Sequence, residues 1–211
     1  MEKQKSFKER TRETLILYAK DYKKYYVDYE YLLCSKAFSR NAYYIVSAHE
    51  DNYLHLTGVH TNLSARNFFN KCYDGTLEES DFNFDKEGQS ESEVKGSVRR
   101  KINALAAIMG IFSKGTIAEE DFCKNRIRCA LATSSADVTL GFAVAGKAKP
   151  MTLLKGNGLD KTKAKALDVV LRRRKGECTF REVLVGDEET VKDYNEYLGF
   201  TSQEVQELCY K

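Results

Sequence analysis

The sequence predicts an α+β protein built on a mainly antiparallel sheet. Strand-like and helix-like hydrophobic patterns both occur, and the strands arrive in two groups with helices between and beside them. Hydrophobic residues make up 42% of the 211 residues and charged residues 31%, which is the balance of a folded globular protein. This length suits one domain, or one domain with small appendages.

The first third of the chain indicates one helix followed by three strands. Apolar and aromatic residues at positions 7, 15, 18, 22 and 25 share one helical stripe, which predicts a helix over residues 6–24. Alternating residues in "VDYEYLL" then indicate a half-buried strand. "NAYYIVSA" and "NYLHLTGV", separated by the polar turn "HEDN", are predicted to be two further strands. We therefore expect a three-stranded meander here.

Two helices are expected in the middle of the chain. "TNLSARNFFNKCYDG" is predicted to be a short helix with Thr61 or Asn62 as its N-cap and Gly75 at its end. An acidic loop over residues 75–93 follows. Apolar residues then recur in steps of three and four from Val94 to Phe112, which predicts a long helix over about 90–113 whose stripe belongs to the core.

The second half of the chain supplies the other group of strands. After a short helical turn near "TIAEEDF", extended segments are predicted at "IRCALATS", "VTLGFAVAG" and "PMTLLKG". "LDVVLRRR" and "CTFREVLVG" are predicted to form a hairpin, because the short link "KGE" contains the glycine that tight turns favour. Two short helices are expected to close the chain, and the second begins at the capping box of Thr201 and Glu204.

Composition and motifs argue against several classes of function. The longest apolar run, near residues 104–112, is far shorter than the roughly 20 residues of a membrane helix, and the charged N-terminus carries no secretory signal. The six cysteines form no C-x-x-C pair, so we interpret them as reduced thiols of a cytoplasmic protein. Neither a G-x-x-x-x-G-K-S/T nor a G-x-G-x-x-G motif is present, so no cofactor is expected.

The three histidines gather in and just before "NYLHLTGVHTN". If "YLHLTGV" is a strand, Tyr53, His55 and Thr57 project from one polar face. A histidine titrates near pH 6.5, so His55 is a candidate for proton transfer, with Thr57 placed to contact a phosphate or a 2′-hydroxyl. A half-exposed polar face with a hydrogen-bonded histidine explains the pattern equally well. A metal site is not expected, because His49 and His60 would lie near the two ends of the strand.

The densest basic cluster is "LRRRKGE", residues 171–177. It falls at the start of the predicted hairpin turn, so alternate side chains point to opposite faces and one or two of them can converge on an anion. An edge strand guarded by charge against pairing with other chains fits the same cluster. The candidates are Arg172, Arg173, Arg174 and Lys175, then Arg181 in the partner strand, and Arg126 and Arg128 before "CALATSS".

The order of several segments resembles a known family. These segments are "YLHLTGV", "SARNFFNKC", "VRRKINALAAIMGIF", "TLGFAVAGKAKPMTLLKG" and "ALDVVLRRRKGECTFREVLV". Together they resemble the phage-associated nuclease-like families of the barnase, EndoU, colicin and RelE (BECR) fold, in particular the fourth phage family. The resemblance implies a compact α+β domain with a curved antiparallel sheet. It spans roughly residues 25–187, so we expect a single domain over residues 1–211 with an N-terminal helix (1–24), this BECR-like core (25–187) and C-terminal helices (188–211).

The resemblance also implies metal-independent RNA cleavage by a phage- or prophage-encoded protein. A 2′-hydroxyl attacks the neighbouring phosphate, one side chain takes its proton, and cations stabilise the developing charge. His55 would then transfer the proton and Thr57 would contact phosphate or ribose, while Arg172, Arg174 and Arg181 would stabilise the phosphate. No second general acid or base is identified in the sequence.

An alternative function keeps the fold as a binding module without catalysis. In that case the chain would be a phage protein that binds and inhibits a host defence factor or serves virion assembly. The small net charge of +3 and the missing second proton-transfer group favour this alternative. The expected partners are therefore RNA in the first case and a host protein in the second, with an immunity protein as a further partner of an active nuclease and no membrane in either.

Overall fold

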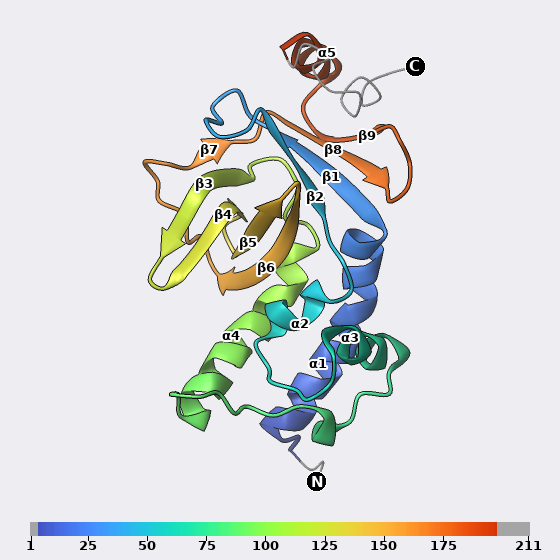
Figure 1. The fold of residues 1–211 in the computed structure, drawn as a ribbon, viewed down its shortest axis with the longest axis vertical. Helices are drawn as coiled ribbons and strands as arrows, with labels where there is room; N and C mark the ends of the chain where they lie inside the picture. Colours follow the sequence, from blue (N-terminus) through green and yellow to red (C-terminus); the bar gives the residue numbers. More distant parts are fainter. Residues whose placement is uncertain (1–3, 198–211) are drawn as a thin grey trace.

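A computed structural model describes residues 4–197, which form one open, curved sheet with helices against it (Figure 1). The strands are β1 (Tyr29–Cys34), β2 (Tyr43–Ser47), β3 (Ile117–Lys124), β4 (Ile127–Ser134), β5 (Val138–Ala145), β6 (Lys147–Lys155), β7 (Lys165–Ala166), β8 (Val169–Arg174) and β9 (Glu182–Val185). Their order across the sheet is β7-β3-β4-β5-β6-β2-β1-β8-β9. Every neighbouring pair is antiparallel except β2 and β6, which meet in parallel at Val46 and Ala148.

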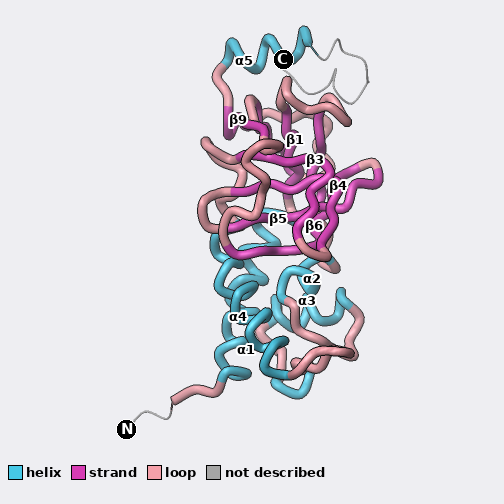
Figure 2. The backbone as a smooth tube through the Cα atoms, turned by 90° about the vertical axis from the view of Figure 1, so that its left-hand side faces the viewer, coloured by secondary structure: helices cyan, strands magenta, loops and turns pink. Residues whose placement is uncertain are grey.

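The helices gather mainly at one end of the molecule. They are α1 (Phe7–Tyr22), the π-helical turn η1 (Lys23–Val27), α2 (Asn52–Thr57), α3 (Ala65–Asp74), the 3₁₀ turn η2 (Glu79–Asp81), α4 (Glu91–Ile108) and α5 (Glu188–Tyr197). Figures 1 and 2 show α1 to α4 together at one end of the sheet and α5 at the opposite end. Over residues 4–197, no helix combines the length and the apolarity that a membrane crossing needs.

The two faces of the β1–β8 region are both buried, but by different elements. On the helical side, Tyr26 of η1 donates from its hydroxyl to the Ile108 carbonyl of α4 at 2.6 Å and ties the helices together. On the other side, Leu32 and Leu171 pack against Phe180 and against Val191 of α5. A polar side chain on that second face is therefore removed from water unless it lies near the edge of the apolar cluster.

The predicted fold class is confirmed, and most of the predicted elements are present. The N-terminal helix, the strands at "VDYEYLL" and "NAYYIVSA", the later strands and the terminal hairpin all form as expected. The long central helix ends at Ile108, earlier than predicted. The predicted capping box of Thr201 and Glu204 lies outside the residues that the structure describes.

The predicted strand at "NYLHLTGV" is wrong, because this segment forms helix α2. Its buried residues Tyr53, Leu56 and Thr57 follow the spacing of a helical face. Gly58 ends the helix in the left-handed region at φ +77°, a conformation that glycine adopts without steric cost. A short apolar run is ambiguous between the two periods, and here packing against the core selects the helix.

The helical turn predicted near "TIAEEDF" is also wrong, because the segment belongs to strand β3. Its acidic residues have tertiary partners that a local pattern does not show. The carboxylate of Glu120 accepts the backbone N–H groups of Ser39 at 2.7 Å and Arg40 at 3.0 Å. Glu119 accepts the backbone N–H of Asp160 at 2.7 Å. These hydrogen bonds from distant loops stabilise the two carboxylates within a strand.

The N-cap of α3 is Ser64 rather than Thr61 or Asn62, because the Ser64 hydroxyl accepts the Asn67 backbone N–H at 3.2 Å. Replacing Ser64 with alanine is expected to lower the free energy of unfolding by about 1 kcal/mol, since that N–H loses its partner. Urea unfolding of the variant measures the loss. Ser92→Ala, in the first turn of α4, removes an exposed hydroxyl without removing a cap. An equal loss in both variants would contradict the capping role.

Candidate functional site

The residues predicted around His55 do not form an exposed polar face. Because the segment is helical, Tyr53 points inward and donates to the Leu15 carbonyl at 2.7 Å. Thr57 is fully buried, and its hydroxyl donates to the Leu54 carbonyl of its own helix at 2.8 Å. Only His55 has an exposed side chain. The grouping of the three side chains on one strand face is therefore wrong.

The arginines of the hairpin lie in a different part of the molecule from α2. Helix α2 packs mainly against β6, α3 and α4, whereas β8 packs against β1, β9 and α5. Arg172 forms an ion pair with Glu182 of β9 at 2.5 Å and stacks over the Tyr29 ring. Arg174 and Arg181 are exposed. Arg172 and Arg173 point to opposite faces of the sheet, as the strand period predicts. Arg173 contacts Phe180, which lies on the face away from the main core.

The histidine window and the basic hairpin do meet, but through other residues. The ammonium group of Lys175 donates to the Ala48 carbonyl at 2.7 Å. This contact brings the end of the hairpin strand beside His49, whose pKa the positive charge of Lys175 helps to lower. The end of the basic cluster and one histidine, His49, therefore lie close together.

The register of four neighbouring strands builds this site. In the order β6-β2-β1-β8, Glu30 of β1 pairs with Ser47 of β2 on one side and with Arg173 of β8 on the other. Directly paired residues point to the same face of a sheet. Lys147 reaches the same carboxylate from the start of β6. We call this group the Glu30 cluster, and its members are Glu30, Ser47, His49, Lys147, Arg173 and Lys175.

Glu30 is a buried carboxylate with cations on both of its oxygens. Its side chain is 4% exposed and that of Arg173 is 7% exposed. Arg173 donates Nε and Nη2 to Oε2 of Glu30 at 3.0 and 2.8 Å, and Lys147 donates to Oε1 at 2.9 Å. Burial alone raises the pKa of Glu30, but the hydrogen bonds from Lys147, Ser47 and Arg173 outweigh it and the pKa is lowered. Glu30 is therefore ionised at neutral pH.

His49 and Lys175 form the accessible rim of the cluster. Partial burial lowers the pKa of His49 from its usual 6.5, and the charges of Lys175 and Lys149 lower it further. His49 is thus neutral at pH 7 and can accept a proton. Burial also lowers the pKa of Lys175 from its usual value, so its ammonium gives up a proton more readily than a solvated lysine does.

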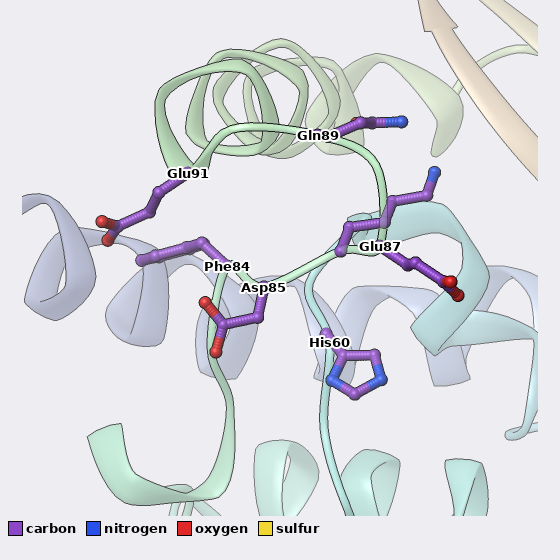
Figure 3. Close-up of a pocket in the computed structure, with 7 residues that line it drawn as sticks. His60, Phe84, Asp85, Glu87, Gln89 and Glu91 are labelled. Carbon is purple, nitrogen blue, oxygen red and sulfur yellow. The ribbon is translucent and has the colours of Figure 1, made fainter.

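The third histidine, His60, lies apart from both regions. It lines an open cavity of about 480 Å³ with Asp85, Glu87 and Glu91. Figure 3 shows the carboxylates of these three residues pointing in different directions around the cavity. In the part of the chain that the structure describes, no three His, Cys, Asp or Glu side chains are grouped as metal ligands.

Three members of the cluster, Glu30, Ser47 and Lys147, are not among the candidates from the sequence. One signal for Glu30 was available, because the alternate positions after it, Leu32 and Cys34, are both apolar. A charged residue on an otherwise apolar strand face needs a partner when it is buried. Lys147 follows the turn glycine Gly146 and has no comparable local signal.

Comparison with known proteins gives one family match. The family model described as phage-Barnase-EndoU-ColicinE5/D-RelE like nuclease4 (PBECR4) matches residues 15–192, which is most of the chain. No curated protein matches the chain, and no solved structure matches it either.

Proposed function

Since the chain belongs to the phage-Barnase-EndoU-ColicinE5/D-RelE like nuclease4 family, we propose that it is a ribonuclease whose active site is the Glu30 cluster. One observation carries this proposal. Four neighbouring strands gather cations around an ionised carboxylate at the rim of an otherwise apolar sheet face, and one cation of this cluster, Lys175, lies close to a neutral histidine. This combination of a proton acceptor and clustered positive charge suits the cleavage of a phosphodiester.

The chemistry proceeds by attack of the RNA 2′-hydroxyl on the adjacent phosphorus. His49 takes the 2′-hydroxyl proton as the bond from O2′ to phosphorus forms. The bond from phosphorus to O5′ breaks, and the Lys175 ammonium gives a proton to the leaving oxygen. The products are a 2′,3′-cyclic phosphate and a free 5′-hydroxyl. The lowered pKa of His49 keeps its ring neutral and able to accept a proton at pH 7, and the lowered pKa of Lys175 shifts its ammonium toward the working pH, where proton transfer is most effective.

Glu30 acts in this proposal as a positioning residue rather than as the base. Its carboxylate is too buried to reach a ribose, but it holds Lys147 and Arg173 in fixed geometry. Lys147 is the more accessible of the two cations, with 39% of its side chain exposed. Its ammonium is thus placed to stabilise the charge that develops on the phosphate oxygens, and its orientation is set before substrate binds.

The roles assigned to His55, Thr57, Arg172, Arg174 and Arg181 from the family resemblance stay predictions. The exposed side chains of His55, Arg174 and Arg181 can be reached by a substrate. Arg172 is engaged by Glu182, and the Thr57 hydroxyl is used within its own helix. The Glu30 cluster therefore offers a more complete set of groups in one place.

Purified protein incubated with total RNA in EDTA is expected to produce fragments with cyclic-phosphate ends. EDTA removes divalent ions, so cleavage under these conditions depends on side chains alone. A matched strand with a single 2′-deoxy sugar at a cleaved position is the control, and it should stay intact at that position. Intact RNA across about pH 5–9, a range that covers the usual pKa of a histidine, would contradict the proposal, as would cleavage of the 2′-deoxy strand.

A further inference from the structure

A second polar site lies where α2 and α4 meet the sheet. It is a cavity of about 480 Å³. Its walls come from the end of α2, the middle of α4, the segment before α4, the turn between β3 and β4, and the end of β6. We call it the basic cavity, and the residues used below are Lys86, Ser97, Arg100, Lys101, Thr152 and Lys155.

Among the described residues, the walls of the basic cavity carry four cations and no carboxylate. These cations are Lys86, Arg100, Lys101 and Lys155. Within residues 4–197, none of the ion pairs involves any of the four. Like charges brought together around one space repel one another, and an anion in that space removes the repulsion. The charge of the walls therefore selects for an anionic ligand.

Lys101 is the most constrained of these cations. Its aliphatic chain crosses Gly58 so closely that a Cβ on that glycine would lie 2.8 Å from Cδ of Lys101. Its ammonium donates one hydrogen bond, to the His55 carbonyl at 2.9 Å. An ammonium has three N–H groups, so two of them remain for a ligand. Lys101 is thus held in place at the wall of the cavity by its contact with Gly58 and its bond to the His55 carbonyl.

We propose that the basic cavity binds the phosphate of a nucleotide-sized phosphate ester. Arg100 and Lys101 would bind the phosphate oxygens, and the hydroxyls of Ser97 and Thr152 offer further hydrogen bonds. The apolar side chains of Val94, Ile127 and Leu154 on the same walls provide a surface for an uncharged base. The volume lies in the range of about 300–1,000 Å³ that is usual for small-molecule sites.

The basic cavity is separate from the Glu30 cluster. Lys147 and Lys155 stand at opposite ends of β6, which places them roughly 26 Å apart at a rise of about 3.3 Å per residue. One phosphate cannot bridge this distance. The inference therefore does not rest on the proposed nuclease activity, and binding can be measured in a protein that does not cleave.

Calorimetric titration of the full chain with adenosine 5′-monophosphate tests the proposal. The nucleotide is expected to bind, and adenosine without its phosphate is expected to bind at least tenfold more weakly. Arg100→Gln and Lys155→Gln should each weaken nucleotide binding at least fivefold. Lys192→Gln removes an exposed lysine of α5 as the matched control and should leave the affinity unchanged. No binding of the nucleotide, or equal affinity in all these variants, would overturn the proposal.

The source of the phosphate is distinguished by competition. A short 2′-O-methyl RNA, which cannot be cleaved by 2′-hydroxyl attack, is added to protein saturated with the mononucleotide. If the RNA displaces the mononucleotide, and does so less well in Arg100→Gln, the ligand is a phosphate of an RNA strand. If the RNA does not displace the mononucleotide, the ligand is a free nucleotide. Two results would argue against the cavity as the phosphate site. In the first, the RNA displaces the mononucleotide equally well from the wild type and from Arg100→Gln. In the second, inorganic phosphate does not compete with the mononucleotide for binding.

Raising the pH should weaken nucleotide binding through Lys101. Burial and the nearby charge of Lys86 lower the Lys101 pKa to about 8. The other charged groups that face the cavity are Lys86, Arg100 and Lys155. The affinity should therefore fall as the pH rises from about 7 to about 9, and Lys101→Met should bind more weakly but without this pH dependence. A pH dependence that persists in Lys101→Met would overturn the role of Lys101.

Discussion

Replacing Arg173 with methionine is expected to lower the free energy of unfolding by roughly 3–5 kcal/mol, because the buried carboxylate of Glu30 loses the guanidinium that donates two hydrogen bonds to it. The two side chains are 7% and 4% exposed, so water does not replace the lost bonds. Arg173 also donates to the Cys178 carbonyl at 2.7 Å and stacks over the Phe180 ring. Lys147 still holds the other oxygen of Glu30, which places the expected loss toward the lower end of the range. Urea unfolding at neutral pH measures it.

The neighbouring exposed arginine gives the control, and pH gives a second readout. Arg174→Met removes the same charge from the same strand and is expected to cost less than about 0.5 kcal/mol. The pKa of Glu30 in the folded protein lies below the 4.5 of a free glutamate. Its stabilising contribution is thus complete above that value and is lost as the pH falls below it. The difference between the wild type and Arg173→Met should therefore shrink in acid, and a pH-independent difference would contradict the ion-pair explanation.

The periodicity of hydrophobic residues correctly predicts the helices and strands that bury one face along their whole length. The alternation in β1 and the stripe of α4 each predict one buried face, and both are present. The segment around His55 satisfied both periods over a few residues, and contacts with α4 and β6 selected the helix. In β3, the run of acidic residues suggests a helical turn when it is considered alone. Their hydrogen-bond partners, however, are backbone amides far away in the sequence, such as those of Ser39 and Asp160. No short window of sequence contains that information.

The sequence predicts which segments contribute to the candidate site, but it does not predict which of their residues contact one another. The histidine window and the basic cluster are both visible in the sequence, and both contribute to the Glu30 cluster. Which members meet depends on the strand register, because a shift of one residue would turn Arg173 away from Glu30 and bring Arg172 or Arg174 to that face. The order β6-β2-β1-β8 also brings in Lys147 through a parallel contact between strands far apart in the chain. Local patterns fix neither the register nor this order.

The cluster and the basic cavity differ in what their charges accomplish. In the Glu30 cluster a buried carboxylate balances the cations Lys147 and Arg173, so the positive groups are fixed in position before a ligand arrives. In the basic cavity no carboxylate from residues 4–197 stands among the four cations on the walls, which leaves their charge to the proposed anionic ligand or to solvent. The first arrangement suits stabilisation of a transient charge, since preorganised groups need no rearrangement during the reaction. The second suits retention of a ligand.

Replacing His49 with alanine is expected to slow RNA cleavage by roughly 10²–10⁴-fold, which is the usual contribution of a positioned proton-transfer group. The His49 side chain is exposed, so the thermal unfolding midpoint should stay close to that of the wild type. The pH dependence provides a further test. Because the pKa of His49 is lowered from 6.5, the rate of the wild type should fall only when the pH drops below that value and the base becomes protonated.

His55→Ala is the matched comparison, because it removes a second exposed histidine from the neighbouring helix. If the Glu30 cluster is the active site, His55→Ala keeps its cleavage rate while His49→Ala loses it. Glu30→Gln, whose neutral amide binds Lys147 and Arg173 less strongly, should lower the rate and leave the acidic limb of the pH profile in place, since His49 remains the base. The opposite ranking of the two histidine variants would move the proton acceptor to α2 and contradict the proposed site.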